Sequence, residues 1–334
     1  MKTFIVLCGL FLGVNACFAA PGYQVVKKLP LGGEGGWDYL TEDSSVDRLY
    51  VSRGTHVMVV DLKTGTLAGD IPGTLGVHGI ALAPKINRGF TSNGKANTCT
   101  IFDRTSLKVL GQVKTGENPD AILYEPVTNR VFTFNGRSND ATIFDASTGT
   151  VVTTIVLGGK PEFAVSDNKG KIFVNIETAN EIAEIDAKQM KVTRKFALAP
   201  CEEPSGLAFD QERRLLFAAC RNKMLAVMEA DTGKIIATVP IGAKVDGCGF
   251  DPGTKLAFTS NGDGTMTVIG ESAPGKFVVV DTVQTQIGSR TMAVDPTKHH
   301  IYLPAAQFLP PKEEKARPEM VKDSFVILVV GSLP

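Results

Sequence analysis

The side chains of this sequence that could bind a charged ligand recur at a regular interval. Seven positions, 40 to 44 residues apart, carry Asp38, His78, Asp120, Glu162, Ser205, Asp246 and Arg290. An aromatic residue follows each of them after eleven or twelve positions: Tyr50, Phe90, Phe132, Phe173, Phe217, Phe258 and Tyr302. Carboxylates and imidazoles are ligands of divalent metals, and a guanidinium binds carboxylates or phosphates. These seven marker positions are candidates for a site wherever the fold brings them together.

The marker positions divide into two halves with different chemistry. In a ring, Asp38 and Asp246 would flank Arg290, so these three predict a structural charge cluster. His78, Asp120 and Glu162 occupy three successive repeats, and we expect this half to have no built-in cation. Carboxylates about 7 Å apart repel by roughly 2.4 kcal/mol at an effective dielectric near 20, so this half favours a counter-ion. We expect it to bind a divalent metal, calcium or zinc, or a cationic group; alternatively, these side chains face only water or nearby backbone.

The elements that must position these residues are short strands. The repeat length is that of a four-stranded propeller blade. The third repeat shows the unit, with strands predicted at 120–124, 130–134, 141–144 and 151–157 and a tight Asp-to-Gly turn at 145–149. We predict an all-β fold, a seven-bladed β-propeller with four antiparallel strands per blade. The marker positions should then surround the mouth of its central channel.

The last repeat supplies three strands, near 291–294, 300–303 and 325–330. The segment Tyr23–Leu29 resembles an outer strand, and we expect it to join the last blade as the fourth. This arrangement would close the ring and cover two strand edges that otherwise promote aggregation. Residues 305–323 form a long loop in the same blade, rich in Pro and mixed charge, which is typical of a lid or a disordered segment.

Loops around the predicted mouth add further candidates. Arg53, Arg137 and Arg221 follow the second strands of their blades and could bind a carboxylate or phosphate through a forked guanidinium, although solvated surface is the alternative for each. Three Asn-Gly pairs lie at equivalent places. For their asparagines, Asn93, Asn135 and Asn261, we favour a role in turn geometry.

The stretches Phe90-Thr-Ser-Asn-Gly94, Phe132-Thr-Phe-Asn-Gly136 and Phe258-Thr-Ser-Asn-Gly262 resemble the YVTN repeat of YncE-like seven-bladed propellers. The similarity extends over most of the chain, but Ile176, Cys220 and Ala305 replace the asparagine in three blades. The resemblance implies a fold and no shared catalytic set. By fold analogy alone, metal-dependent lactonases and dehydrogenase propellers suggest an alternative, a hydrolase or periplasmic oxidoreductase with His78, Asp120 and Glu162 as ligands.

Residues 1–20 have the pattern of a cleaved signal peptide: Lys2, a short apolar core and small residues ending at Ala20. This predicts a secreted or periplasmic protein with one domain over residues 21–334; a lipoprotein cleaved before Cys17 is an alternative. The 35 basic and 35 acidic residues balance without long runs, which argues against nucleic-acid binding. No later segment could span a membrane, and we expect a monomer.

Cys201 and Cys220 should lie on one face of the fifth blade, so we predict a disulfide between them in an oxidising compartment.

Motifs for covalent haem, serine hydrolases and zinc proteases are absent from the sequence. The resulting hypothesis is a secreted, non-catalytic propeller. It would bind a small molecule, a metal or a protein partner through Asp38, His78, Asp120, Glu162, Asp246, Arg290, Arg53, Arg137 and Arg221.

Overall fold

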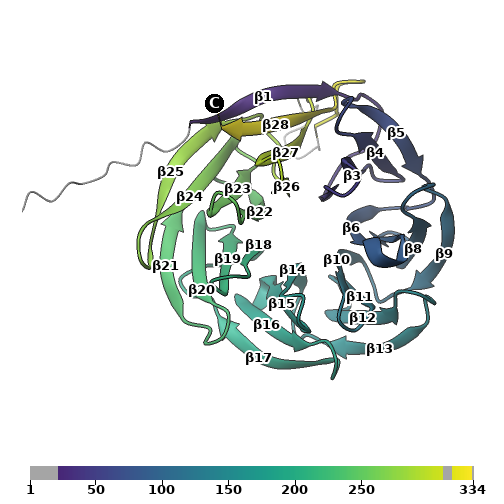
Figure 1. The fold of residues 1–334 in the computed structure, drawn as a ribbon, viewed down its shortest axis with the longest axis horizontal. Coiled ribbons are helices and arrows are strands. Elements are labelled where there is room, and N and C mark those ends of the chain that lie inside the picture. The colour runs from purple at the N-terminus through teal and green to yellow at the C-terminus, as the bar shows by residue number, and fades with distance from the viewer. Residues whose placement is uncertain (1–21, 311–317, 333–334) are drawn as a thin grey trace, which may run out of the picture.

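The computed structural model describes residues 22–310 and 318–332, which form seven antiparallel four-stranded sheets arranged in a ring (Figure 1). The predicted seven-bladed β-propeller is confirmed. The predicted signal peptide and Cys17 lie outside the described residues. No helix in the described ranges is long and apolar enough to cross a membrane.

Blade 1 consists of β2 (Leu40–Asp43), β3 (Arg48–Ser52), β4 (Val57–Asp61) and β5 (Thr66–Ile71). Blade 2 consists of β6 (Val77–Ala83), β7 (Arg88–Asn93), β8 (Thr98–Asp103) and β9 (Val109–Lys114). Blade 3 consists of β10 (Pro119–Glu125), β11 (Arg130–Asn135), β12 (Asp140–Asp145) and β13 (Val151–Val156). Blade 4 consists of β14 (Pro161–Ser166), β15 (Lys171–Ile176), β16 (Glu181–Asp186) and β17 (Lys191–Ala197). Blade 5 consists of β18 (Pro204–Asp210), β19 (Leu215–Cys220), β20 (Met224–Glu229) and β21 (Ile235–Pro240). Blade 6 consists of β22 (Val245–Asp251), β23 (Leu256–Asn261), β24 (Thr265–Ala273) and β25 (Lys276–Gln284). Short 3-10 helices, η1 (Pro84–Ile86) and η2 (Glu177–Ala179), lie in two of the turns.

Blade 7 contains β26 (Ala293–Asp295), β27 (His300–Ala305), β28 (Val326–Ser332) and, on its outside, β1 (Tyr23–Pro30). The N-terminal strand therefore completes the last blade, as predicted, and β1 and β28 lie side by side in Figure 1. The inner strand begins two residues later than predicted from the sequence. Arg290, Thr291 and Met292 precede it without regular secondary structure.

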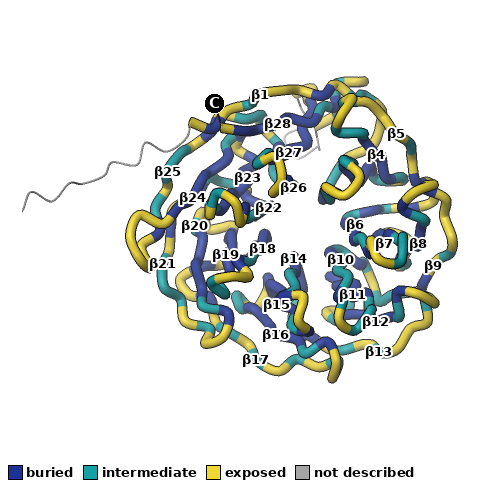
Figure 2. The backbone as a smooth tube through the Cα atoms, viewed as in Figure 1, coloured by how far each residue is buried: buried dark blue, intermediate teal, exposed yellow. Residues whose placement is uncertain are grey.

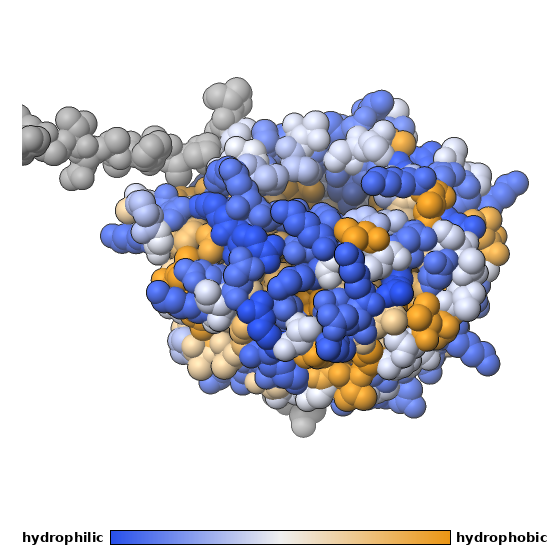
Figure 3. All heavy atoms as spheres, turned by 60° about the horizontal axis from the view of Figure 1, so that its bottom comes forward, coloured by the Kyte–Doolittle hydropathy of each residue, from blue (hydrophilic) through white to orange (hydrophobic). Residues whose placement is uncertain are grey.

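The core lies between neighbouring blades. In a typical blade the second strand is almost fully buried, as in β11, whereas the outer strand alternates between exposed and half-buried residues, as in β13. Figure 2 shows this gradient from the inside of the ring to its rim. The marker aromatics contribute to these interfaces; for example, Phe90 contacts Phe144 of the next blade with ring centroids 5.8 Å apart. The face drawn in Figure 3 is mostly hydrophilic, with apolar side chains in separate patches.

The asparagines of the repeated Asn-Gly pairs have a different role from the predicted one. None of the three, all in described residues, has a positive φ. Asn93 is fully buried, accepts a hydrogen bond from Thr91 Oγ1 (2.8 Å) and donates to Thr100 Oγ1 (2.9 Å) on the next strand. Asn135 and Asn261 do the same with equivalent threonines. The amide thus joins the second and third strands, because a buried amide requires hydrogen-bond partners.

The structure pairs Cys201 with Cys220 as a disulfide, with a Cα–Cα distance of 5.8 Å and both residues fully buried in blade 5. Cys99 and Cys248 are free and buried. Cys248 lies in the inner strand β22 of blade 6.

We expect the disulfide to resist reduction in the native protein and to open only in denaturant. Closing 19 residues of chain restricts the unfolded state, so Cys201→Ala combined with Cys220→Ala should lower the free energy of unfolding by about 3 kcal/mol. Peptide mapping of non-reduced protein should recover the linked pair, and urea titration gives the energy. Cys248→Ala is the matched control. Free thiols at positions 201 and 220 in protein from an oxidising compartment would contradict this prediction.

Candidate ligand site at the mouth of the central channel

Backbone irregularities position most of the marker side chains. The register between the first and second strands shifts at Val77/Ile80, Pro119/Ile122, Pro161/Ala164, Pro204/Gly206 and Val245/Gly247. His78, Asp120, Glu162, Ser205 and Asp246 lie within these shifts. A β-bulge redirects a side chain out of the regular alternation of a strand. The repeated bulges therefore explain why these polar groups meet at the channel mouth.

One half of the site is organised by Arg290. Its Nε donates to Asp246 Oδ2 over 2.6 Å, and its Nη2 lies 3.6 Å from Asp38 Oδ1. Ser205 Oγ donates to the other oxygen of Asp246 at 2.6 Å. The predicted cluster of Asp38, Arg290 and Asp246 is thus present in the structure.

Asp38 also connects this half with the next one. Its Oδ2 lies 2.6 Å from His78 Nδ1, and the same nitrogen lies 3.7 Å from Asp120 Oδ1. One ligand atom from each of the three residues lies within 4.8 Å of the others. The side chains are 14 to 28% exposed, so the group is open to the mouth. The structure thus assembles Asp38, His78 and Asp120, and not the expected set of His78, Asp120 and Glu162.

Glu162 differs because it has its own cation. Lys160 Nζ contacts both Glu162 and Glu177, and Arg221 Nη1 lies 2.8 Å from the other oxygen of Glu177. The expectation that this half contains no built-in cation was wrong. That expectation considered only equivalent positions of the repeats, whereas Lys160 belongs to the loop before blade 4. Lys160 lies two residues before Glu162, which is the signal that sequence analysis missed.

The pKa values of Asp120, His78 and Glu162 are all raised above their ordinary values. Burial raises the pKa of Asp120 to about 6, although the charge of His78 opposes the shift. Burial acts to lower the pKa of His78, but the hydrogen bond to Asp38 and the charge of Asp120 raise it above its ordinary value. Burial, helped by Asp120, also raises the pKa of Glu162. Groups that share a site with excess negative charge keep protons in this way.

The pKa shifts of Glu162 and Glu177 are opposite. Burial alone would raise the pKa of Glu177, but its interaction with Glu162 and the contact with Lys160 lower it. Glu162 therefore holds a proton more firmly than Glu177 does, and Glu177 is the more acidic partner of Lys160.

Two aromatic residues close the channel below the ring of charges. The rings of Tyr39, from blade 1, and Phe163, from blade 4, meet with centroids 5.1 Å apart. Burial, together with Asp120 and Glu162, raises the pKa of Tyr39 well above its ordinary value. In a seven-membered ring these blades are opposite one another, so the pair crosses the channel. Among the residues that directly follow the markers, only these two are aromatic, but the sequence does not indicate that they meet.

Below this plug lies a mostly apolar cavity of about 310 Å³. Its lining includes Phe163, Phe209, Phe250 and Met292, together with Glu42. The plug therefore lies between the charged mouth and this cavity.

Arg53 is not available to bind a carboxylate or phosphate at the surface, contrary to one of the sequence interpretations. Its side chain is fully buried, and Nη2 donates to the carbonyls of Gly33 and Glu34, both at 3.0 Å. The guanidinium lies 3.6 Å from the ring centroid of Phe325. Burial lowers its pKa to about 10. The cation–π contact with the Phe325 ring stabilises the Arg53 guanidinium in its buried position.

Arg137 is exposed and takes no part in the contacts at the mouth among the described residues. Arg221 lines a cavity of about 350 Å³ with Lys244, Val245, Asp246 and Arg290. Two of its three cations are already paired with carboxylates. This cavity is an open extension of the mouth towards blades 5 and 6.

The fold and the site together define a seven-bladed β-propeller with a plugged channel and an acid-rich, proton-holding mouth. Its fold is similar to that of a chain of the hydrazine synthase of Kuenenia stuttgartiensis, with a TM-score of 0.73, 13% identity, and 94% of this chain and 99% of that chain covered. The U3-55K structure also gives a TM-score of 0.73, at 7% identity, with 90% and 97% covered. These identities support the fold alone. No family model and no curated protein sequence matches.

Proposed function

We propose that this protein is a non-catalytic binding propeller of the YncE-like type that holds a divalent metal ion at its channel mouth, between Asp38, His78 and Asp120. The observation that carries the proposal is the contact of two carboxylates with one ring nitrogen, Nδ1 of His78, at 2.6 and 3.7 Å. A hydrogen bond from this nitrogen to an ionised carboxylate requires a proton on Nδ1. A metal ion would replace it.

The charge balance of the mouth supports a cation there. Asp38, Asp120, Asp246, Glu162 and Glu177 face three fixed cations, Lys160, Arg221 and Arg290, and one imidazole. With all five acids ionised and the imidazole neutral, two negative charges remain unbalanced. The raised pKa values of Asp120 and His78 show how protons cover this excess. A divalent ion would cover it equally and release the protons.

The donor set favours zinc or a similar transition ion over calcium. One imidazole and two carboxylates suit zinc, whereas calcium prefers six or more oxygens. We further propose that the protein acts outside the cytoplasm as a monomer, since a buried disulfide is typical of oxidising compartments.

Calorimetry on protein stripped with a chelator should detect zinc binding with a Kd of about 1 to 10 µM at neutral pH. Asp38→Asn and Asp120→Asn should each weaken binding by about 30-fold or more, because each removes a charged ligand. Glu162→Gln is the matched control, since that carboxyl is engaged by Lys160, and should change binding by less than about threefold.

Affinity should fall as the pH decreases through the raised pKa of His78 and the value of about 6 for Asp120, because protons then compete for the ligand atoms. Binding should also release protons, seen as a dependence of the heat on the buffer. A parent protein that binds none of zinc, manganese and calcium, or equal affinities in Asp38→Asn and Glu162→Gln, would reject the metal site.

A hydrolytic role is the second candidate, because three protein ligands with partly exposed side chains leave positions for water on a metal ion. The same zinc-loaded samples should be tested with simple lactones and esters. Hydrolysis that depends on zinc and is lost in Asp120→Asn would favour the enzyme. No turnover above that of free zinc would favour the binding protein.

A further inference from the structure

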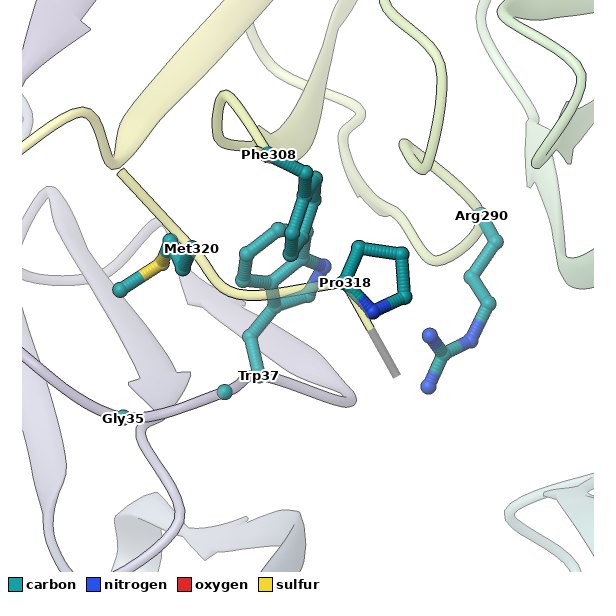
Figure 4. Close-up of a pocket in the computed structure, with 7 residues that line it drawn as sticks. Gly35, Trp37, Arg290, Phe308, Pro318 and Met320 are labelled. Atoms are coloured by element: carbon teal, nitrogen blue, oxygen red, sulfur yellow. The ribbon is translucent and has the colours of Figure 1, made fainter. Parts of the chain in front are cut away.

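A cavity of about 570 Å³ lies beside the mouth, between the start of blade 1 and the described parts of the long loop of blade 7. It is lined by Gly35, Gly36, Trp37, Arg290, Phe308, Pro318 and Met320 (Figure 4). The loop emerges from β27 and returns to β28 as a paired stem, in which Leu309 N donates to the Glu319 carbonyl and Val321 N to that of Gln307. The stem thus holds Phe308 and Met320 over the cavity.

Aromatic groups form one wall. The Trp37 ring lies between Phe308 and Phe325, with centroid distances of 5.9 and 5.4 Å. Phe325 is fully buried, but Phe308 is 43% exposed at the rim of the cavity. Figure 4 shows the Trp37 and Phe308 rings against each other, with Pro318 drawn between them and Arg290. A flat apolar group could replace the solvent over these faces.

A cation lies across the cavity from the aromatic wall. Arg290 lines the cavity, and its side chain is 44% exposed. Its Nε donates to Asp246, and its Nη2 lies 3.6 Å from Asp38. The exposed part of the guanidinium can therefore bind an anionic group of a ligand.

We propose that this cavity binds a small aromatic carboxylate, with its ring against Trp37 and Phe308 and its carboxylate on the exposed part of the Arg290 guanidinium. Asp246 and Asp38 already fix the orientation of this guanidinium, which pre-organises its exposed nitrogens to donate to a further carboxylate. This inference does not depend on the metal site, and its test is carried out in the presence of a chelator.

Trp37 is the only tryptophan of the chain, so its emission reports on this cavity directly. Benzoate is the probe, with benzamide as its uncharged analogue of nearly the same shape. Titrating native protein with benzoate up to about 20 mM should change the emission saturably, and calorimetry should give the same Kd. Benzamide should bind about tenfold more weakly or not at all, because it lacks the charge that Arg290 recognises.

Phe308→Ala should weaken benzoate binding by about fivefold or more, whereas Leu309→Ala, which removes an equally exposed neighbour outside the cavity, should leave it within about twofold. Arg290→Met should abolish the preference for benzoate over benzamide, with circular dichroism to verify folding. If that variant does not fold, the native benzoate and benzamide titrations and the Phe308 and Leu309 variants decide. Absence of saturable benzoate binding, equal affinity for benzamide, or equal effects of Phe308→Ala and Leu309→Ala would overturn the proposal.

Discussion

A chain that lacks residues 22–31 is expected to lose its soluble monomeric ring. Strand β1 pairs with β28 from Tyr23↔Ser332 to Pro30↔Val326, and it buries Tyr23 and Leu29. Those two side chains contribute about 3 to 6 kcal/mol, and each strand hydrogen bond about 1 kcal/mol. Together these losses are comparable to the 5 to 15 kcal/mol that stabilises a typical domain.

The strand also joins three blades. Tyr23 N donates to Asp281 Oδ2 at 2.9 Å, and the Tyr23 ring contacts Phe258 at 5.4 Å, both in blade 6. Leu29 packs in a cluster with Leu49 and Val60 of blade 1. Removal of β1 would therefore open the ring. It would expose the buried face and the edge of β28, which favours association between chains.

Size-exclusion chromatography with light scattering and thermal unfolding test this expectation. A synthetic peptide of residues 22–31, added during refolding, should restore the monomer and most of the transition. A peptide of the same composition in scrambled order serves as the control. A truncated chain that stays monomeric with an unchanged melting temperature would show that β1 does not close the ring.

Arg104→Met is expected to lower the free energy of unfolding by about 3 to 5 kcal/mol, because it leaves a buried carboxylate without its cation. Arg104 Nε donates to Asp43 Oδ2 at 2.5 Å and Nη2 contacts Ser45, and the paired side chains are only 9% and 4% exposed. This ion pair links blade 2 with blade 1. Urea unfolding followed by circular dichroism measures the effect.

Lys255→Met is the matched control. Lys255 pairs with Glu212 on the surface, where the side chains are 46% and 74% exposed, and such pairs contribute at most about 1 kcal/mol. Adding Asp43→Asn to Arg104→Met should recover part of the loss by removing the unpaired charge. Similar losses for Arg104→Met and Lys255→Met would mean that burial does not determine the strength of the pair.

The architecture was predictable because its information is local and repeated. An apolar strand, a turn and a marker aromatic occur seven times at nearly one spacing, and each four-stranded unit can bury its faces only against a neighbour. The same local rules predicted the tight turn at 145–149: Asp145 accepts from the backbone of Ser147 and Thr148, and Gly149 adopts a φ of +75°. The fourth strand of blade 7 followed from counting strands.

The sequence alone also identified the marker residues as neighbours at the mouth, since equivalent positions of a closed repeat must form a ring. It could not decide which of them pair. Asp38 turns towards His78 and leaves Arg290 mainly to Asp246, and Lys160 neutralises Glu162 from a loop outside the repeat pattern. Such choices depend on differences of about an ångström between charged atoms, over which Coulomb energies in a partly buried site change strongly.

The plug and the cavity beside the mouth were decided only by the tertiary structure. Tyr39 and Phe163 meet because their blades face each other across the channel, 124 positions apart in the sequence. Trp37 acquires its surroundings from Phe308 and Phe325, at the other end of the chain. Repeats specify which positions are equivalent, but contacts across the ring and at its closure join non-equivalent positions. Their packing is set by side-chain size and direction in three dimensions, which a one-dimensional period does not contain.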